Sequence, residues 1–492
     1  MWNNLPVSFH AGSNHDLFLV GCAAATVLLL LLLIARVRLH PALALTVGAL
    51  GLGVASGMPL VQVPLSFTAG VGNLMGHIAI VLGLGAVLGR LLATSGGATA
   101  LGGALVEGCG PRGLPWALMA VGIVVGLPVF FEVGLVLMLP IVAAAAERAN
   151  RPPILVGIPL LAGLSIVHGV LPPHPAAMLA VTQFHADMGR TILWGLIVGV
   201  PAAALAGPGL GWLLMRRWER RKAAGVQTEE EQPLFAPTHE DQVPQYRDRV
   251  PQVPLLGPGI ATNSIPAPAG PIRAALAILL PVALIFLGSW ADLLAAPGGI
   301  FNQVLHFIGS ADVALLIAVL VALVTLGGHT QTGAIKSPEG LRKLTGEAFE
   351  PIAGVLVILA AAGGLSGILR DSGAAQATVG LALGAHIPPL LLAWLLAAVV
   401  RVATGSATVA MAVAAGILAP VASQFGVRPE LLVLATGTGS LILSHVNDPG
   451  FWLIQSFFKI DLKETFSTWT VLEMVLSVAG LGTTLALAAV LR

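Results

Sequence analysis

The sequence predicts an all-α, polytopic membrane protein, and its composition, its long apolar runs and its charge pattern support this fold class. Hydrophobic residues make up 56% of the 492 positions and charged residues only 10%, whereas soluble domains carry about 25% charged residues. The 59 glycines and 34 prolines are typical of membrane helices that pack closely and break often. The net charge of +1 gives no indication of a nucleic acid partner.

Residues 1–221 are predicted to form an N-terminal transmembrane half. The first apolar run, Leu17–Ile34, is long enough to cross a bilayer. It ends at Arg36 and Arg38, which the positive-inside rule places in the cytoplasm, so the N-terminus is expected outside. Further apolar runs follow at 41–54, 65–92, 116–146, 153–167 and 191–215. The last of them ends in the basic cluster 216–222, a second cytoplasmic mark.

Residues 222–271 are rich in Pro, Gln, Glu and Asp, which predicts a flexible cytoplasmic linker. Residues 272–492 are predicted to form the C-terminal transmembrane half. Its charge pattern places the C-terminus outside as well, so the number of full crossings is even. We expect about ten to twelve crossings, together with re-entrant segments.

The two halves contain an internal repeat, about residues 65–215 and 349–492. Each copy has a Ser-Gly break, then an interrupted apolar segment, then a histidine followed by proline; the pairs are Ser95 and Ser372, Glu132 and Thr404–Thr408, and His168 and His445. The charge pattern gives the two copies opposite orientations in the membrane. Inverted repeats with interrupted segments at matching positions indicate a transporter with its site at the membrane midplane.

Glu132 is a carboxylate inside the apolar run 116–146, next to a Gly-Leu-Pro interruption. A charge and a helix break are tolerated at this depth only beside water or protein. Glu132 is therefore a candidate for binding and releasing a proton during transport. The alternative is a structural carboxylate that a basic partner neutralises or that caps a half-helix.

The two Ser-Gly breaks are candidate anion sites. At Ser95-Gly96 and at Ser372-Gly373, free N–H groups at the start of a half-helix attract a negative charge. The alternative is a tight hairpin turn in which the serine caps the next helix.

Arg401 precedes three hydroxyl residues, Thr404, Ser406 and Thr408. A guanidinium can bind a carboxylate with two hydrogen bonds, and hydroxyl groups suit a polyhydroxylated ligand. The alternative for Arg401 is a position at the membrane interface with its head group in water.

Three histidines lie at predicted breaks, His168, His174 and His445, and Asn447 and Asp448 follow the last of them. They are candidates for ligand binding, proton transfer or core hydrogen bonds. Their spacing does not match a metal site, and the chain has no phosphate-binding loop. We expect no cofactor and no enzymatic activity.

Several strings resemble the gluconate permease family of bacterial inner-membrane proton symporters: GLPVFFEVG at 126–134, HGVLPPHP at 168–175, RVATGSATV at 401–409, SHVNDPGFW at 444–452 and KETFSTWT at 463–470. The resemblance covers most of the chain outside the linker. It implies uptake of gluconate, another hexonate, glycerate or D-serine with protons. It also implies membership of the ion-transporter superfamily, homodimers, and a transport domain that moves past a scaffold. Three features depart from the family pattern and put the substrate in doubt: the proline at 449 that follows Asp448, the threonine at 94, and the long linker.

The sequence therefore predicts a proton-coupled symporter for a gluconate-like anion in the inner membrane. The substrate carboxylate is expected at Ser95, Gly96, Ser372, Gly373 or Arg401. Its hydroxyls are expected near Thr404, Ser406, Thr408, Asn447 and the histidines, with Glu132 or Asp448 carrying the proton. Sodium coupling, a membrane-embedded enzyme and a passive channel are the other classes that the sequence leaves open.

Overall fold

The computed structural model describes residues 14–107, 109–223, 269–330, 337–378 and 387–491, and within these ranges every regular element is helical. The first half contains α1 (Asn14–Leu31), α2 (Pro41–Ala55), α3 (Gln62–Thr94), α4 (Gly97–Val106), α5 (Leu114–Gly126), α6 (Phe131–Ala149), α7 (Pro153–Val170), α8 (Pro175–Phe184), α9 (Met188–Ala204) and α10 (Leu210–Ala223). The second half contains α11 (Pro271–Ser289), α12 (Ala291–Leu294), α13 (Ile300–Gly309), α14 (Ala311–Leu326), α15 (Pro338–Asp371), α17 (Pro389–Thr404), α18 (Ala407–Leu418), α19 (Pro429–Gly439), α20 (Pro449–Phe458), α21 (Leu462–Thr465) and α22 (Val471–Val490).

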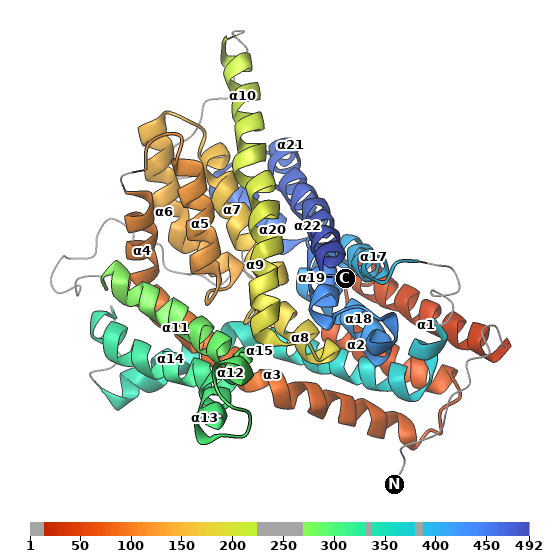
Figure 1. Cartoon of the computed structure of the whole chain (residues 1–492). Coiled ribbons are helices and arrows are strands. Elements are labelled where there is room, and N and C mark those ends of the chain that lie inside the picture. Colours follow the sequence, from red (N-terminus) through yellow and green to blue (C-terminus); the bar gives the residue numbers. More distant parts are fainter. Residues whose placement is uncertain (1–13, 108, 224–268, 331–336, 379–386, 492) are drawn as a thin grey trace.

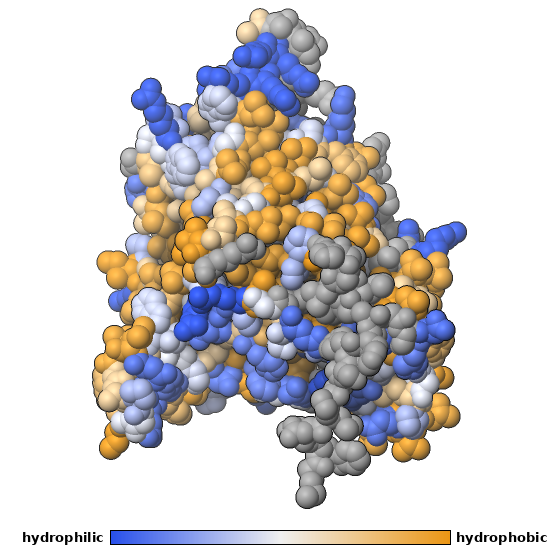
Figure 2. All heavy atoms as spheres, turned by 45° about the vertical axis from the view of Figure 1, so that its right-hand side comes forward, coloured by the Kyte–Doolittle hydropathy of each residue, from blue (hydrophilic) through white to orange (hydrophobic). Residues whose placement is uncertain are grey.

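Nine helices in the described ranges are long and apolar enough to cross a membrane, and five shorter apolar helices accompany them. The chain is thus an all-helical membrane protein, as the sequence predicts. Figure 2 shows a broad apolar area beneath the hydrophilic end of α10. That end carries the predicted basic cluster, in which Arg216 and Lys222 lie over the rings of Trp212 and Trp218. The linker prediction falls mainly on residues 224–268, which lie outside the described residues.

The two longest helices in the described ranges, α3 and α15, lie side by side across the lower part of Figure 1. Gly70 of α3 meets Gly363 at one end of the pair, and Arg90 forms an ion pair with Glu347 at the other. The helices are therefore antiparallel. A Cβ added to Gly70 would overlap the Gly363 carbonyl, so the absence of a side chain is what allows the two backbones to touch.

Two helical hairpins, α5–α6 and α17–α18, interrupt the predicted apolar runs. Leu127–Phe130 connects the first pair, and Gly405 and Ser406 connect the second. Each hairpin packs closely on the helix that follows it, again through glycine: Gly122 of α5 lies against α7, and Gly439 of α19 lies against α17. The helices α7 and α19 then break, before α8 and α20 respectively.

The short helices α12 and α13 lie between α11 and α14 and were not expected from the sequence. The Asn302 side chain of α13 donates to the Asp292 carboxylate at 2.9 Å, and a His306 ring nitrogen lies 3.0 Å from it. These contacts hold the pKa of Asp292 below its ordinary value, the Asn302 hydrogen bond having the largest effect. The contacts join α12 to α13; the Asp292 and His306 side chains are exposed, whereas Asn302 is buried.

Candidate functional site

The centre of the site is a buried ion pair between Arg401, in the last turn of α17, and Asp448, the residue before α20. Their exposed fractions are 4% and 7%. Arg401 donates through one terminal nitrogen to the Asp448 carboxylate and through the other to the carbonyl of Gly405. The guanidinium thus joins the tip of the second hairpin to the start of α20. A carboxylate and a cation can be buried together because each compensates the charge of the other.

Asp448 has further hydrogen-bond partners that fix its position. It caps α20 by accepting the Gly450 N–H at 2.8 Å, and Pro449 begins the helix, where a missing N–H has no consequence. The Ser444 hydroxyl donates to the same carboxylate. Ser444 in turn accepts the indole N–H of Trp469 at 2.7 Å. The break between α19 and α20 is therefore held in one conformation by side-chain hydrogen bonds.

The second hairpin tip and this break contact each other closely. The Asn447 side chain donates to the carbonyl of Val402 at 2.9 Å, and a His445 ring nitrogen lies 2.9 Å from the same oxygen. Gly405 has φ +72°, and a Cβ at this position would overlap the Asn447 backbone. Only glycine fits here without strain. The last carbonyl groups of α17 have no partner within the helix. The contacts from Asn447 and His445 therefore satisfy the Val402 carbonyl, which would otherwise be unpaired.

The first hairpin brings aromatic rings and Glu132 to the break between α7 and α8. The Phe130 ring is 5.7 Å from that of His174, and the His168 and His174 rings are 4.5 Å apart. Phe131 lies between His168 and Trp469, with ring distances of 6.4 and 5.4 Å. Because Trp469 also bonds Ser444, Phe131 links the two breaks.

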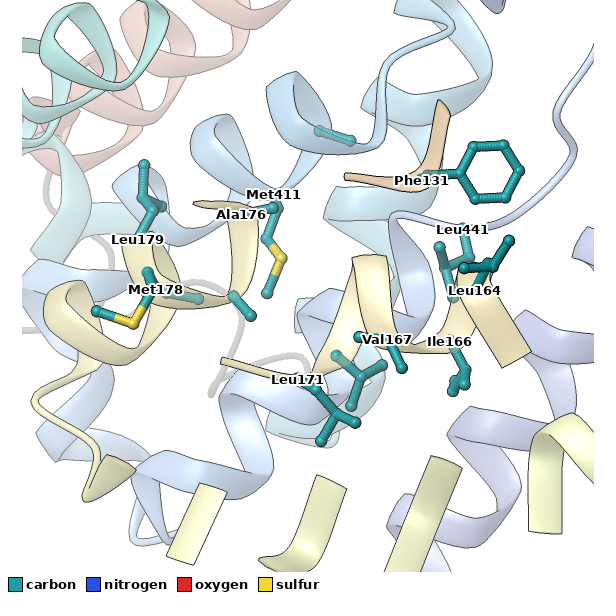
Figure 3. Close-up of a cluster of buried hydrophobic side chains, with 14 of the residues drawn as sticks. Phe131, Leu164, Ile166, Val167, Leu171, Ala176, Met178, Leu179, Met411 and Leu441 are labelled. Carbon is teal, nitrogen blue, oxygen red and sulfur yellow. The ribbon is translucent and has the colours of Figure 1, made fainter. Parts of the chain in front are cut away.

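Apolar side chains surround the break between α7 and α8. Figure 3 shows Phe131, Leu441 and Met411, from three other parts of the chain, around Leu164 and Leu171. All five side chains are buried. The break between α7 and α8 is therefore packed among apolar side chains, where electrostatic interactions are strong.

Three buried nitrogens in this region have no hydrogen-bond partner within the described residues: Nδ1 of His168, Nδ1 of His174 and Nε of Arg401. Such groups are uncommon in folded proteins. The Asp448 charge acts on both His168 and Glu132, so these residues lie within electrostatic range of the ion pair. Glu132 itself is in the first turn of α6 and is exposed. The site thus has unpartnered nitrogens on the cation and on two histidines, and an exposed carboxylate.

The structure places the predicted hydroxyl residues at the second hairpin tip. The Thr404 hydroxyl donates to the Val400 carbonyl at 2.8 Å, and Ser406 caps α18 by accepting the Val409 N–H at 3.3 Å. Thr408 lies in the first turn of α18 and is half-buried. His168, expected in a break, lies in the last turn of α7, because the helix continues to Val170.

The two Ser-Gly breaks do not join this site. Ser95 packs near Ala269 and Ala274, and Gly373 lies near Leu19 of α1. Both serines have the capping role that was the alternative: each hydroxyl accepts the N–H two residues later at 3.3 Å and donates to the carbonyl three residues earlier. Gly96 and Gly373 have φ +68° and +77°, so each makes the turn of a tight hairpin.

Ser95→Ala and Ser372→Ala are therefore expected to lower the free energy of unfolding by about 1 kcal/mol each, the usual effect of losing a helix cap. The initial uptake rate should stay within about twofold of wild type, because neither hydroxyl contacts the ion pair or the histidines. Thermal unfolding and uptake measured on the same preparations test this. A specific loss of uptake in both variants, with unchanged stability, would return these serines to the substrate site.

Sequence reasoning missed Ser165 and Glu473. The Glu473 side chain is only 1% exposed and accepts the Ser165 hydroxyl at 2.5 Å. The rule that an ionisable residue inside an apolar span is functional could have identified it. In the described ranges, no group of three or more His, Cys, Asp or Glu side chains is arranged so that it could hold a metal ion.

Broken apolar helices around a buried polar centre define the class as a membrane transport protein. Within that class, the chain belongs to the GntP permease family, whose profile matches residues 17–245 and 263–491. It is a transporter, not an enzyme, and a multi-pass protein of the bacterial inner membrane.

Relatives match along nearly their whole length. The chain is 42% identical to a gluconate permease of Pseudomonas aeruginosa, over 96% of this chain and 97% of the relative. It is 38% identical to the high-affinity gluconate transporter of Escherichia coli (93% and 96% covered) and 36% identical to the L-idonate transporter of the Gnt-II system in the same organism (95% and 99%). The fold is similar to that of the Alcanivorax borkumensis YdaH transporter, with a TM-score of 0.61, 19% identity, and 92% and 98% of the two chains covered.

Proposed function

We propose that the protein is a secondary active transporter that imports gluconate, or a closely related sugar acid, together with protons. The observation that carries this proposal is the buried Arg401 at the meeting point of a hairpin tip and a helix break, with its Nε unused. A guanidinium has five N–H donors in a planar fork that matches a carboxylate. The relatives named for gluconate and L-idonate indicate the substrate class.

The rest of the ligand would be bound by groups around this cation. Thr404, Ser406 and Thr408 provide hydroxyls on one side, and Asn447 and His445 provide polar groups on the other. The buried, unpartnered His168 and His174 nitrogens would bond the sugar hydroxyls. A hexonate, with one carboxylate and several hydroxyls, suits this set, because its carboxylate accepts from the guanidinium and its hydroxyls can donate to or accept from the unpartnered histidine nitrogens.

The architecture that we infer is an inverted repeat, about 65–215 and 349–492, within transmembrane halves 1–221 and 272–492 joined by the linker 222–271. The antiparallel α3 and α15 and their identical caps at Ser95 and Ser372 support this. The starts of α9 and α21 also support the repeat, because they are capped in the same way. The Asp187 and Asp461 carboxylates each accept the N–H three residues later, at 2.7 and 2.6 Å. A homodimer, about ten to twelve crossings, and movement of the hairpins past a scaffold complete the proposal.

Proton coupling is assigned to Glu132 rather than to Asp448. The Arg401 guanidinium stabilises Asp448 as a carboxylate, and removing that charge by protonation would leave a buried cation unpaired. Glu132 has no ion-pair partner in the described ranges and is exposed. A proton can therefore reach it and leave it.

Uptake into proteoliposomes tests the function. Gluconate should accumulate when the outside is acidic and should not when the pH gradient is collapsed. A sodium requirement at fixed pH would instead indicate a sodium-coupled transporter. Competition by D-serine or glycerate, stronger than by L-idonate, would assign a different substrate.

Glu132→Gln is expected to lower gradient-driven accumulation about tenfold, because the amide cannot take up a proton, while binding of gluconate is retained. Glu147→Gln, at the exposed end of the same helix, is the matched control and should behave as wild type. Uptake by the Glu132→Gln variant that is complete and still follows the pH gradient would remove Glu132 as the proton carrier.

A further inference from the structure

Glu473 is a buried carboxyl group that the proposed mechanism does not use. It lies in the first turn of α22 with an exposed fraction of 1%, and the Ser165 hydroxyl of α7 donates to it at 2.5 Å. Ser165 is also buried. In the described ranges, no Lys, Arg or His comes within ion-pair distance of Glu473. Its charge therefore has no direct compensation.

A carboxyl group in this setting can exist in two forms. An ionised carboxylate without a cation is unfavourable in an apolar interior, whereas the neutral acid is tolerated when it is hydrogen-bonded. A serine hydroxyl suits both forms, because it can donate to a carboxylate and can accept from a carboxylic acid after rotation. Small changes in the surrounding charge would thus decide which form is present.

The charges that can make this change belong to the substrate site. Arg401 and Asp448 both act electrostatically on Glu473. Trp469, one turn before Glu473 along the chain, bonds Ser444, which in turn bonds Asp448. On α7, His168 lies one turn beyond Ser165 and so on the same face of the helix. Glu473 is therefore connected to the ion pair and to the histidines without contacting the proposed ligand groups.

The other elements packed on α22 bring few charges to Glu473. The titratable residues that these elements carry in addition to His168 and Arg401 are Glu430 of α19 and Arg190 of α9. Ser477 of α22 bonds the Thr438 carbonyl, and Trp469 bonds Ser444, so α19 and α22 run antiparallel and Glu430 lies toward the far end of α22. Arg190 lies in the first turn of α9 and is exposed. Two turns further along α9, the Val198 carbonyl accepts the hydroxyl of Thr483, which lies toward the end of α22 that is remote from Glu473. The segments Leu205–Gly209 and Phe466–Thr470 contain no titratable side chain.

We propose that Glu473 is a second proton-binding site of the transport cycle, occluded behind the Arg401–Asp448 pair and coupled to substrate binding through the charge of Arg401. This inference rests on the proposed function. When the substrate anion binds Arg401, it offsets the positive field that favours the Glu473 carboxylate. Glu473 then takes up one proton and changes from charge −1 to neutral, and it releases this proton when the anion leaves. By reciprocity, a proton on Glu473 strengthens anion binding by the same factor.

Infrared difference spectroscopy tests proton binding directly, with the full-length protein in membranes and gluconate as the probe. Adding gluconate should produce the C=O band of a protonated carboxyl group in the wild type and in Glu147→Gln. The band should be missing in Glu473→Gln. Ser165→Ala keeps the carboxyl group but removes its hydrogen bond, so it should shift the band.

Transport measurements provide the second readout. In Glu473→Gln, accumulation driven by a pH gradient should fall about tenfold, while gluconate exchange at equal pH stays within about threefold of wild type, because the amide mimics the protonated form. The exchange rate should also lose part of its pH dependence. If Glu473→Gln does not fold, the band shift in Ser165→Ala decides the matter.

Two outcomes separate this inference from the proposed function. Unchanged spectra and pH-driven accumulation in Glu473→Gln would overturn the role of Glu473 and leave proton symport intact. A wild-type protein whose gluconate uptake ignores the pH gradient would overturn proton symport itself. In that case, acidification without gluconate tests whether Glu473 binds a proton. A carboxyl band that appears on acidification in the wild type and is missing in Glu473→Gln would identify Glu473 as a proton-binding group. The absence of such a band in the wild type would refute this role.

Discussion

Arg401→Ala is expected to abolish gluconate uptake and to lower the free energy of unfolding by about 3–5 kcal/mol, because it leaves the Asp448 carboxylate buried without a cation. The loss of uptake should be at least about a hundredfold, the scale on which truncating one partner of a buried charge pair acts on binding. Thermal unfolding of purified protein and initial uptake rates in proteoliposomes measure the two effects.

Two further variants separate stability from function. In the double variant Arg401→Gln/Asp448→Asn, both charges are removed, so stability should recover in part, whereas uptake should remain lost because the anion has no cation to bind. Arg401→Lys keeps the charge but lacks the planar fork. We expect it to fold and to transport about tenfold more slowly. Near wild-type uptake in the double variant would show that Arg401 is structural and does not bind the substrate.

Gly405→Ala should have the second-largest effect. The positive φ of this residue costs a side chain about 1–2 kcal/mol. The overlap of the new Cβ with the Asn447 backbone adds about 1–3 kcal/mol. The overlap also pushes the hairpin tip away from the break, so Arg401 loses its alignment and uptake should fall strongly.

Gly426→Ala is the matched control for this substitution. Gly426 also has a positive φ, +63°, but no atom lies within 4 Å of the added Cβ. It should therefore show only the backbone strain of about 1–2 kcal/mol, with uptake close to wild type. Equal losses of uptake in the two alanine variants would mean that contact between Gly405 and Asn447 does not position the site.

The sequence predicted the membrane class, the places where helices break, and the residues that gather around the second hairpin. These features follow from local properties: apolar length, proline and glycine. The pairing of Arg401 with Asp448 could not be predicted, because 47 positions separate the two residues and nothing local shows which acid a cation contacts. For the same reason, the sequence could not show that the hydroxyls of Ser95 and Ser372 bond the backbone of their own hairpins.

Glu473 shows a different limit. Its position in the last apolar run was visible in the sequence, but a helix end can lie either at the membrane surface or inside the protein. Only the packing of α22 on α7 places this carboxyl group against Ser165. His168 shows how a proline run misleads: the helix continues past the histidine and ends at Val170, and the prolines begin two residues later.

The two bonds of the Arg401 guanidinium have a mechanical consequence. One terminal nitrogen holds the Gly405 carbonyl at the hairpin tip, and the other holds the Asp448 carboxylate at the start of α20. Pulling these elements apart would strand two opposite charges in a dry interior, which costs several kcal/mol. We therefore expect the α17–α18 hairpin and α20 to move together as one rigid body, with the motion that opens the site taking place at the boundaries of this body and the bonds of Arg401 staying intact.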